Sequence, residues 1–205
     1  MTALHTVDDI VQWLAESPPH RVLGIIGPPG SGKSTLAKDL SSALTIQHTV
    51  VPMDGFHYPQ DTLRALGRRE RMGASDTFDA AGLSELLTEV GRREKDVVFP
   101  EFDRTIEEPV PGSIVVSPDD ELIILEGNYL LVNDDTWSSI GAFLDLSIYV
   151  DIPEDVRVAR LIDRHVTFGK NPTDATEWVH RVDQANARVI EATKDAATAL
   201  YQPIL

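Results

Sequence analysis

The residues with the clearest chemistry form one loop, Gly27 to Ser34, which reads Gly-Pro-Pro-Gly-Ser-Gly-Lys-Ser. This is the spacing G-x-x-x-x-G-K-S, in which backbone N–H groups surround the phosphates of a nucleotide. Because proline has no N–H, the donors must lie after Pro29, between Gly30 and Thr35. Lys33 is expected on the β- and γ-phosphates, and the Ser34 hydroxyl on Mg²⁺. The loop therefore predicts a nucleotide site made by Gly27, Gly30, Ser31, Gly32, Lys33, Ser34 and Thr35.

Two carboxylates follow apolar segments that read as buried strands, Asp54 after 49–53 and Glu126 after 121–125. In open α/β sheets, ligands bind at the carboxyl ends of the strands. We expect Asp54 to act as the general base that accepts a proton from an attacking hydroxyl. We expect Glu126 near the metal. The length of its side chain favours a contact to Mg²⁺ through water, or a contact to the acceptor, over direct ligation of the metal. The alternatives are an ordinary Asp-Gly turn and a solvated strand end.

Three arginines recur on a predicted helix over 154–168, namely Arg157, Arg160 and Arg164. At 100° per residue they occupy a stripe about 60° wide. Such a stripe in a chain of net charge −15 suggests an anionic partner. We predict a lid over about 157–175 that closes on the γ-phosphate, with Arg160 and Arg164 catalytic and Arg157 on the nucleotide. The alternative is ion pairing along the helix surface with neighbouring acidic residues.

Candidate contacts to a phosphoryl acceptor lie close to these motifs. Besides Asp54, they are His57, Tyr58, Arg69, Asp103, Arg104, Asn128 and Tyr129, with Asp183 and Asn186 as further candidates for pocket contacts. Each has a simpler interpretation. The alternative for His57 and Tyr58 is a packing role. Arg69 belongs to a basic cluster over 64–71 that suits a solvated helix face, and Asp103 and Arg104 suit a surface ion pair.

The elements that must position these residues alternate between strands and helices. Strands are predicted over 21–26, 49–53, 97–100, 121–125 and 146–150, and helices over 6–15, 34–44, 80–90 and 154–168. Residues 107–112 carry two prolines and read as a loop before a hairpin strand over 113–116. Asp174 and Glu177 read as a capping box for a last long helix, and 199–205 as a final short strand. This order predicts an α/β fold, a parallel sheet with helices on both faces.

Composition narrows the class of protein. A chain of 205 residues with 42% hydrophobic and 25% charged residues suits one domain, 1–205. The absence of cysteine excludes disulfides, a thiol nucleophile and cysteine-bound zinc. The net charge of −15 disfavours nucleic acid and anionic membranes as partners. No apolar run is long enough to span a bilayer and no signal peptide is evident, so we expect a cytoplasmic protein.

The ordered set of motifs resembles a known family. The loop is followed by D-G-F-H-Y-P at 54–59, D-T-F-D at 76–79, P-x-F-D-R at 100–104, E-G-N-Y at 126–129 and R-x-x-R-x-x-x-R at 157–164. This set resembles the uridine kinase, phosphoribulokinase and bacterial pantothenate kinase superfamily. It is most similar to a branch labelled nucleoside/nucleotide kinase-like or fructose transport system kinase. The resemblance runs from Arg21 to about Arg188.

The resemblance implies a P-loop kinase fold that uses ATP and Mg²⁺. It implies Asp54 as the base, Lys33 and Ser34 on phosphates and metal, Glu126 near the metal, and Arg160 and Arg164 in the lid. Two departures leave the acceptor open. Uridine kinases carry an acidic residue where this chain has His165, and long pantothenate kinases extend beyond this chain's C-terminus.

These observations predict a kinase that transfers the γ-phosphoryl group of ATP to a hydroxyl of a small metabolite, with pantothenate, a nucleoside and a sugar all open. A homodimer is also left open. The alternatives are a GTPase switch and a regulatory nucleotide-binding protein that has no acceptor. The chain lacks the N-K-x-D motif of guanine recognition, and an arginine-lined lid suits transfer to an acceptor better.

Overall fold

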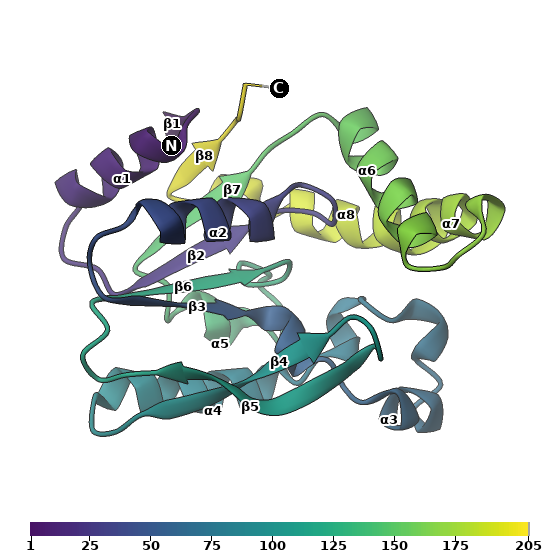
Figure 1. The fold of residues 1–205 in the computed structure, drawn as a ribbon, viewed down its shortest axis with the longest axis horizontal. Coiled ribbons are helices and arrows are strands. Elements are labelled where there is room, and N and C mark those ends of the chain that lie inside the picture. Colours follow the sequence, from purple (N-terminus) through teal and green to yellow (C-terminus); the bar gives the residue numbers. More distant parts are fainter. Residues whose placement is uncertain (205) are drawn as a thin grey trace.

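The structure is a computed structural model that describes residues 1–204. Its centre is a six-stranded sheet in the order β1-β8-β7-β2-β6-β3, in which every neighbouring pair is parallel (Figure 1). The strands are β1 (Thr2–Leu4), β2 (Val22–Ile26), β3 (His48–Pro52), β6 (Leu122–Gly127), β7 (Leu146–Val150) and β8 (Ala199–Tyr201). The predicted α/β class is confirmed.

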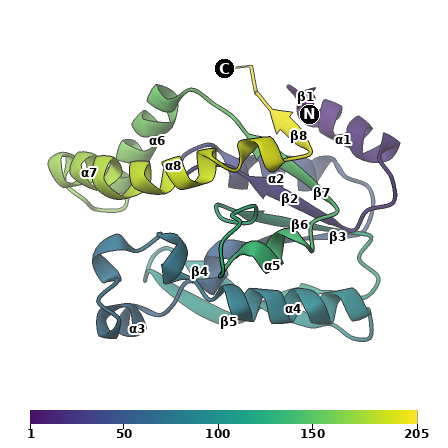
Figure 2. The same cartoon turned by 180° about the vertical axis from the view of Figure 1, so that it is seen from behind.

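Helices cover both faces of this sheet, because residues on both sides of each central strand are apolar. On β2, Leu23 and Ile25 pack with α1 (Val7–Glu16) and α2 (Lys33–Ala43). On the other face, Val22 and Ile26 share a core with α4 (Ala80–Arg92), α5 (Ser138–Gly141) and α8 (Gln184–Glu191). Figure 1 shows α2 in front of the sheet, and Figure 2 shows α4, α5 and α8 on the opposite side.

A separate antiparallel hairpin, β4 (Val97–Asp103) and β5 (Glu108–Val116), lies beyond β3. Residues 108–112 belong to β5, so the loop predicted over 107–112 was largely wrong. Pro109 pairs with Phe102 in the register, and β4 is the only partner of β5 among residues 1–204. The other edge of β5 is free of strand pairing, and proline is tolerated at such an edge because no ladder N–H is missed there.

The predicted lid region contains two helices, α6 (Glu154–Thr167) and α7 (Pro172–Trp178). A π-helical turn, Val179–Asp183, joins α7 to α8. The capping prediction for α7 was wrong, since the Asn171 side chain accepts from the Asp174 N–H and Pro172 occupies the first turn. The two helices lie at the carboxyl end of the sheet, opposite α3 (Gln60–Ala65) and the tip of the hairpin (Figure 1).

The N-terminal segment contains one confirmed and one missed feature. Thr6 and Asp9 form the predicted capping box of α1. Strand β1 was not predicted, and it pairs with β8, where Thr2 lies opposite Ala199. The tail prediction holds for Ala199–Tyr201, while Leu205 lies outside the described residues. Across residues 1–204, no helix is both long and apolar enough to cross a membrane.

Candidate active site

The phosphate-binding loop connects β2 to α2, which is the order that the motif requires. Gly32 is the N-cap of α2 with φ of 96°, and Gly30 has φ of 79°, both in the left-handed region that favours glycine. A Cβ on Gly30 would lie 2.7 Å from the Arg157 carbonyl oxygen, so α6 packs directly on the loop. At Gly32, the nearest atom to such a Cβ is Arg160 Nη1, at 3.7 Å. The loop is thus fixed behind Gly30 and open at Gly32.

Lys33 and Ser34, the first two residues of α2, face two carboxylates. Lys33 is buried and donates to the Pro28 carbonyl oxygen at 3.1 Å. Burial lowers the pKa of Lys33 to about 8, although the charges of Glu126 and Asp54 oppose that change. The Ser34 hydroxyl donates to Glu126 Oε1 at 3.0 Å. Burial, and then the charge of Asp54, raise the pKa of Glu126.

Asp54 is held where the 3₁₀ turn after β3 meets the hairpin. A Cβ on Gly55 would lie 2.1 Å from the Pro100 carbonyl oxygen, so only glycine lets the two segments approach this closely. The approach brings Arg104 Nη2 to 2.6 Å from Asp54 Oδ2. Burial acts to raise the pKa of Asp54, but the charges of His57, Arg104 and Lys33 outweigh it and lower the pKa. Asp54 is therefore an ionised carboxylate.

His57 is a packed residue of the pocket wall. Its ring lies 3.9 Å from that of Phe78 and 4.7 Å from that of Phe102, between ring centroids. Its Nδ1 lies 2.9 Å from the Asp54 carbonyl oxygen, which assigns the ring proton to Nδ1 as the donor. Burial lowers the pKa of His57, although the charge of Asp54 opposes that change, and the Nδ1 hydrogen bond orients the backbone of Asp54.

The predicted arginine stripe is divided between two environments. Arg164 lines the same pocket as Lys33, Asp54 and Arg104, and burial, followed by the charge of Arg104, lowers its pKa. Arg160 lies over Gly32. Arg157, expected on the nucleotide, is fully buried behind the loop. It donates to the Pro29 carbonyl oxygen at 3.2 Å and to Gln184 Oε1 at 2.7 Å, and it pairs with Glu191 at 3.6 Å.

We expect Arg157→Met to lower the free energy of unfolding by about 2–4 kcal/mol, because the Pro29 carbonyl, Gln184 and Glu191 would lose their shared donor. ATP affinity should fall with it, since Pro29 belongs to the loop. Urea unfolding and calorimetric titration with ATP measure the two effects. Arg188→Met, at an exposed position of α8, is the control. An Arg157→Met protein with the stability and ATP affinity of the parent would contradict this positioning role.

The remaining candidates separate into two groups. Arg69 and Asn128 line the pocket with Asp54 and His57. Tyr58, Asp103 and Tyr129 do not line it: Asp103 accepts from the Thr105 N–H in the hairpin turn, and Tyr129 is buried. Asp183 and Asn186, the two further candidates for pocket contacts, also line the pocket. Sequence reasoning missed other lining residues, namely Met72, Gly73, Phe78, Phe102, Glu107 and Trp178, whereas His165 and Lys170 lie within the predicted lid.

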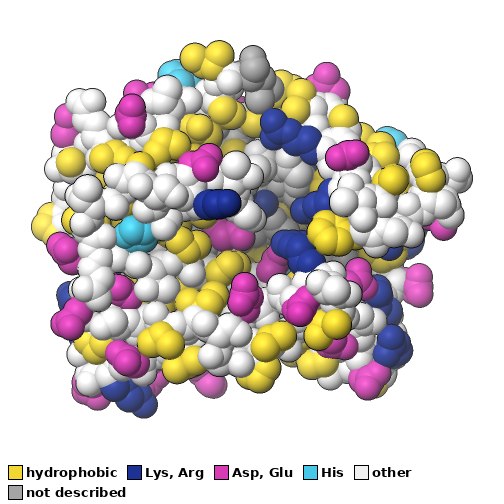
Figure 3. Space-filling view, in the orientation of Figure 1, with side chains coloured by type: hydrophobic (Ala, Val, Ile, Leu, Met, Phe, Trp, Pro, Cys, Tyr) yellow, Lys and Arg dark blue, Asp and Glu magenta, His cyan; other side chains and the backbone are white. Residues whose placement is uncertain are grey.

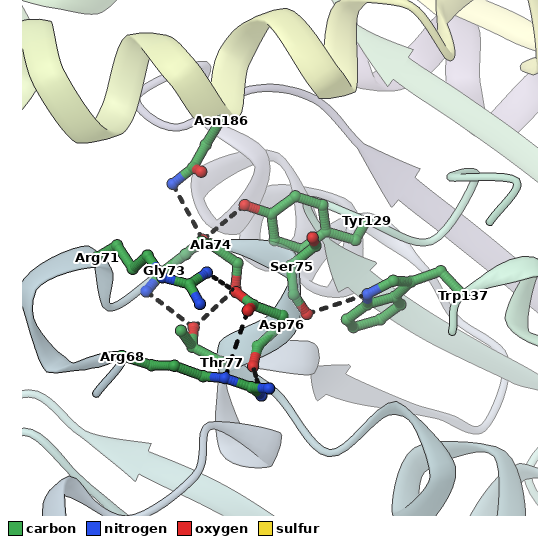
Figure 4. A network of polar contacts seen from close by, with 10 residues as sticks. All are labelled: Arg68, Arg71, Gly73, Ala74, Ser75, Asp76, Thr77, Tyr129, Trp137 and Asn186. Atoms are coloured by element: carbon green, nitrogen blue, oxygen red, sulfur yellow. Dashed lines mark hydrogen bonds and ion pairs between the residues drawn. The ribbon is translucent and has the colours of Figure 1, made fainter. Parts of the chain in front are cut away.

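Tyr129 is buried and supports the pocket wall by a hydrogen bond to its backbone. Its hydroxyl donates to the Gly73 carbonyl oxygen at 2.6 Å, and Asn186 Nδ2 donates to the same oxygen at 3.1 Å. Trp137 Nε1 donates to the Ser75 carbonyl oxygen at 3.1 Å. Figure 4 shows these donors converging on segment 73–77, with Arg68 and Arg71 on Asp76 from the other side. The loop that carries Met72 and Gly73 is therefore a fixed wall.

These elements surround one hollow at the carboxyl end of the sheet, with Lys and Arg side chains around it (Figure 3). The model of the Phosphoribulokinase / Uridine kinase family matches residues 22–204. The chain belongs to this family. Its members and relatives transfer phosphate to a hydroxyl, and this kinase shares their P-loop fold.

Three relatives show how close the similarity is. "Putative uridine kinase C227.14" of Schizosaccharomyces pombe is 35% identical over 184 residues, 83% of this chain and 77% of the relative. "Pantothenate kinase" of Yersinia enterocolitica is 31% identical over 195 residues, 89% of this chain and 61% of the relative. The crystal structure of a "putative fructose transport system kinase" from Silicibacter sp. TM1040 is 34% identical, with a TM-score of 0.89 over 97% of this chain and all of the other.

Membership of the family implies ATP, with Mg²⁺ as the usual metal, and the residues present fit both. The cradle is open at Gly32, where a Cβ would meet only Arg160. Among the residues that the structure describes, Lys33 has one acceptor, the Pro28 carbonyl, so two of its three N–H donors remain for phosphate oxygens. Ser34 and Glu126 offer oxygen ligands 3.0 Å apart. Mg²⁺ is commonly held by one or two such groups together with phosphates and water.

Proposed function

We propose that this kinase transfers the γ-phosphoryl group of ATP, with Mg²⁺, to a hydroxyl of a small metabolite. The observation that carries the proposal is the position of Asp54. Its ionised carboxylate, held by Arg104, lines the same pocket as the loop residues Lys33 and Ser34 and as Arg164. A base near a phosphate cradle and between cations suits transfer to an acceptor hydroxyl.

The roles follow from this geometry. Asp54 accepts the proton of the acceptor hydroxyl while that oxygen bonds to the γ-phosphorus and the bond from phosphorus to the β–γ bridging oxygen breaks. Lys33, Arg160 and Arg164 stabilise the charge that spreads over the transferred group. Ser34 and Glu126 would hold Mg²⁺, which neutralises phosphate charge when bound. Gly30 to Thr35 supply the backbone donors for the phosphates.

Arg104 has a further role in this proposal. Its ion pair with Asp54 keeps the carboxylate unprotonated and fixes its direction. Burial and then the charge of Arg104 lower the pKa of Arg164, so an anionic group between the two guanidinium groups relieves their repulsion. Lys33, whose pKa the charge of Arg104 also lowers, lies near the same place. This convergence of cations is where we place the γ-phosphate.

The acceptor belongs to one of three classes, suggested by the names of the relatives: pantothenate, a nucleoside or a sugar. We also propose that the protein works in the cytoplasm, where ATP is available. A nucleotide-gated switch without an acceptor is the competing function. It predicts ATP binding with no acceptor-dependent formation of ADP.

A coupled assay of ADP release tests the proposal over the three acceptor classes, with Mg²⁺ and with excess EDTA. We expect at least one compound to raise ADP release well above the rate without acceptor, and EDTA to abolish the increase. The Lys33→Met protein, purified in the same way, controls for contaminating kinases. The proposal fails if ATP binds and no compound of any class stimulates ADP release.

A further inference from the structure

The half of the pocket away from the phosphate loop contains charged side chains from several elements. Arg69 comes from the 3₁₀ turn after α3, Glu107 from the hairpin tip, and Asp183 from the π-helical turn. Lys170 comes from the segment between α6 and α7. In a chain of net charge −15, any cation here without an acidic partner creates a local preference for an anion.

Most of these charges already have partners. Arg69 Nη2 pairs with Glu107 Oε2 at 2.8 Å, and its Nε donates to Gln60 Oε1 at 3.1 Å. Arg104 pairs with Asp54. Asp183 Oδ2 lies 2.9 Å from His165 Nε2. The two arginine–carboxylate pairs each combine one positive and one negative charge, so they favour no net charge on a ligand. The contact between Asp183 and His165 is a hydrogen bond.

Lys170 differs from them. Its ammonium lies 4.7 Å from the centroid of the Trp178 ring, and within residues 1–204 no carboxylate approaches it within ion-pairing distance. A cation–π contact positions an ammonium group and leaves its N–H donors available for an anion. Lys170 lines both the main pocket and the adjoining hollow that contains Arg104, Glu107 and Arg164.

The same wall offers partners for hydroxyl groups. Asn186 is buried and uses its Nδ2 on the Gly73 carbonyl, which leaves its Oδ1 as an acceptor. Asp183 is buried and has its Oδ1 free of any hydrogen bond within residues 1–204, and Asn128 adds an amide. These oxygens are available as acceptors in the pocket wall, and a ligand with several hydroxyls can donate to them.

We propose that the acceptor is a small hydroxy acid. One hydroxyl meets Asp54, further hydroxyls meet Asp183 and Asn186, and a carboxylate or phosphate pairs with Lys170. The inference rests on the proposed function and names the substrate class of that same site. It also assigns Lys170, which lies in the predicted lid, to the acceptor and not to the nucleotide.

Matched pairs of compounds test the charge requirement in the ADP-release assay. Pantothenate is compared with pantothenol, uridine 5′-monophosphate with uridine, and glucose with gluconate and glucose 6-phosphate. We expect the anionic member of at least one series to be favoured by about 10-fold or more in kcat/KM, as one charge-assisted contact implies. The glucose series separates a carboxylate from a phosphate. Equal or better turnover of the neutral members overturns this inference and leaves the kinase function standing.

Variants of Lys170 test whether this residue binds the anionic group of the acceptor. The assay uses the acceptor with the highest kcat/KM in the compound series. Lys170→Gln should raise the KM for the acceptor about 10-fold or more, and Lys170→Arg should restore most of it. The Lys95→Gln protein, changed at an exposed lysine near the far end of α4, is the matched control. If Lys170→Gln raises the KM for ATP instead, or if Lys170→Arg is as impaired as Lys170→Gln, the assignment is wrong. No stimulation by any compound in the parent protein would instead contradict the proposed function.

Discussion

Asp54→Asn is expected to lower kcat by about 10²–10⁴, because asparagine keeps the shape of the side chain but cannot accept the proton of the attacking hydroxyl. The pairing with Arg104 at 2.6 Å would lose its charge but retain an oxygen acceptor. The loop from Gly27 to Ser34 is untouched, so the Kd for ATP should stay within about threefold of the parent value. Steady-state ADP release and ATP titration measure the two quantities.

The matched control is Asp61→Asn, at an exposed carboxylate that pairs with Arg64 on the surface of α3. It should leave kcat unchanged. A parent-like kcat for Asp54→Asn would remove Asp54 from the mechanism. A large loss of ATP affinity in the same variant would mean that Asp54 serves the nucleotide site and not the acceptor.

Lys33→Met should lower kcat/KM for ATP by about 10²–10³ or more, since a buried cation that offsets developing charge is removed. The same substitution should not lower the free energy of unfolding at pH 7, although it lowers activity. Burial lowers the pKa of Lys33 from 10.5 to about 8, so the folded protein binds this proton less strongly than the unfolded chain does. The charged lysine therefore weakens the fold below pH 8, by up to about 3 kcal/mol.

That penalty disappears as the pH rises from about 8 to 10.5, because Lys33 then loses its proton in the folded state first. The parent protein should gain stability over this window relative to Lys33→Met, while at pH 7 the variant should be as stable as the parent or more stable. Urea unfolding of both proteins at several pH values gives this difference, in which the titration of other groups largely cancels. A variant that is less stable at pH 7 and shows the same pH dependence as the parent contradicts the assignment.

Buried strands were the part of the fold that could be predicted most closely. Strand β7 occupies Leu146–Val150, as expected, because a parallel strand covered on both faces is a continuous apolar run. The first part of strand β5, residues 108–112, was mistaken for a loop because its prolines are usually turn signals, and only the free edge of the hairpin makes them tolerable. The hairpin strand predicted over 113–116 is confirmed. Strand β1 has three residues and no local signal, so it depends on the edge that β8 presents.

The site was predictable where chemistry and spacing coincide in one motif. Lys33, Ser34, Asp54 and Glu126 line one pocket because they lie at or beyond the carboxyl ends of neighbouring strands. Lys170 and Trp178 also reach that pocket, and they do so through the geometry of the lid region and a π-helical turn, which a sequence pattern does not indicate. Arg157 was predicted on the nucleotide but donates to the Pro29 carbonyl oxygen. A helical stripe predicts the direction of a side chain only approximately, and a shift of one turn along the helix is enough to move it from the pocket to the backbone of the loop.

The pairing of β1 with β8 bears on how the protein is made. Thr2–Leu4 leaves the ribosome well before its strand partner, Ala199–Tyr201, which is synthesised almost 200 residues later. At about 5–20 residues per second, β1 waits roughly 10–40 s for that partner. During this interval Leu4, which is buried in the finished protein, is exposed together with the open edge of β7. Cotranslational folding of this kinase therefore ends at its N-terminal strand, where nascent chains remain open to misassociation.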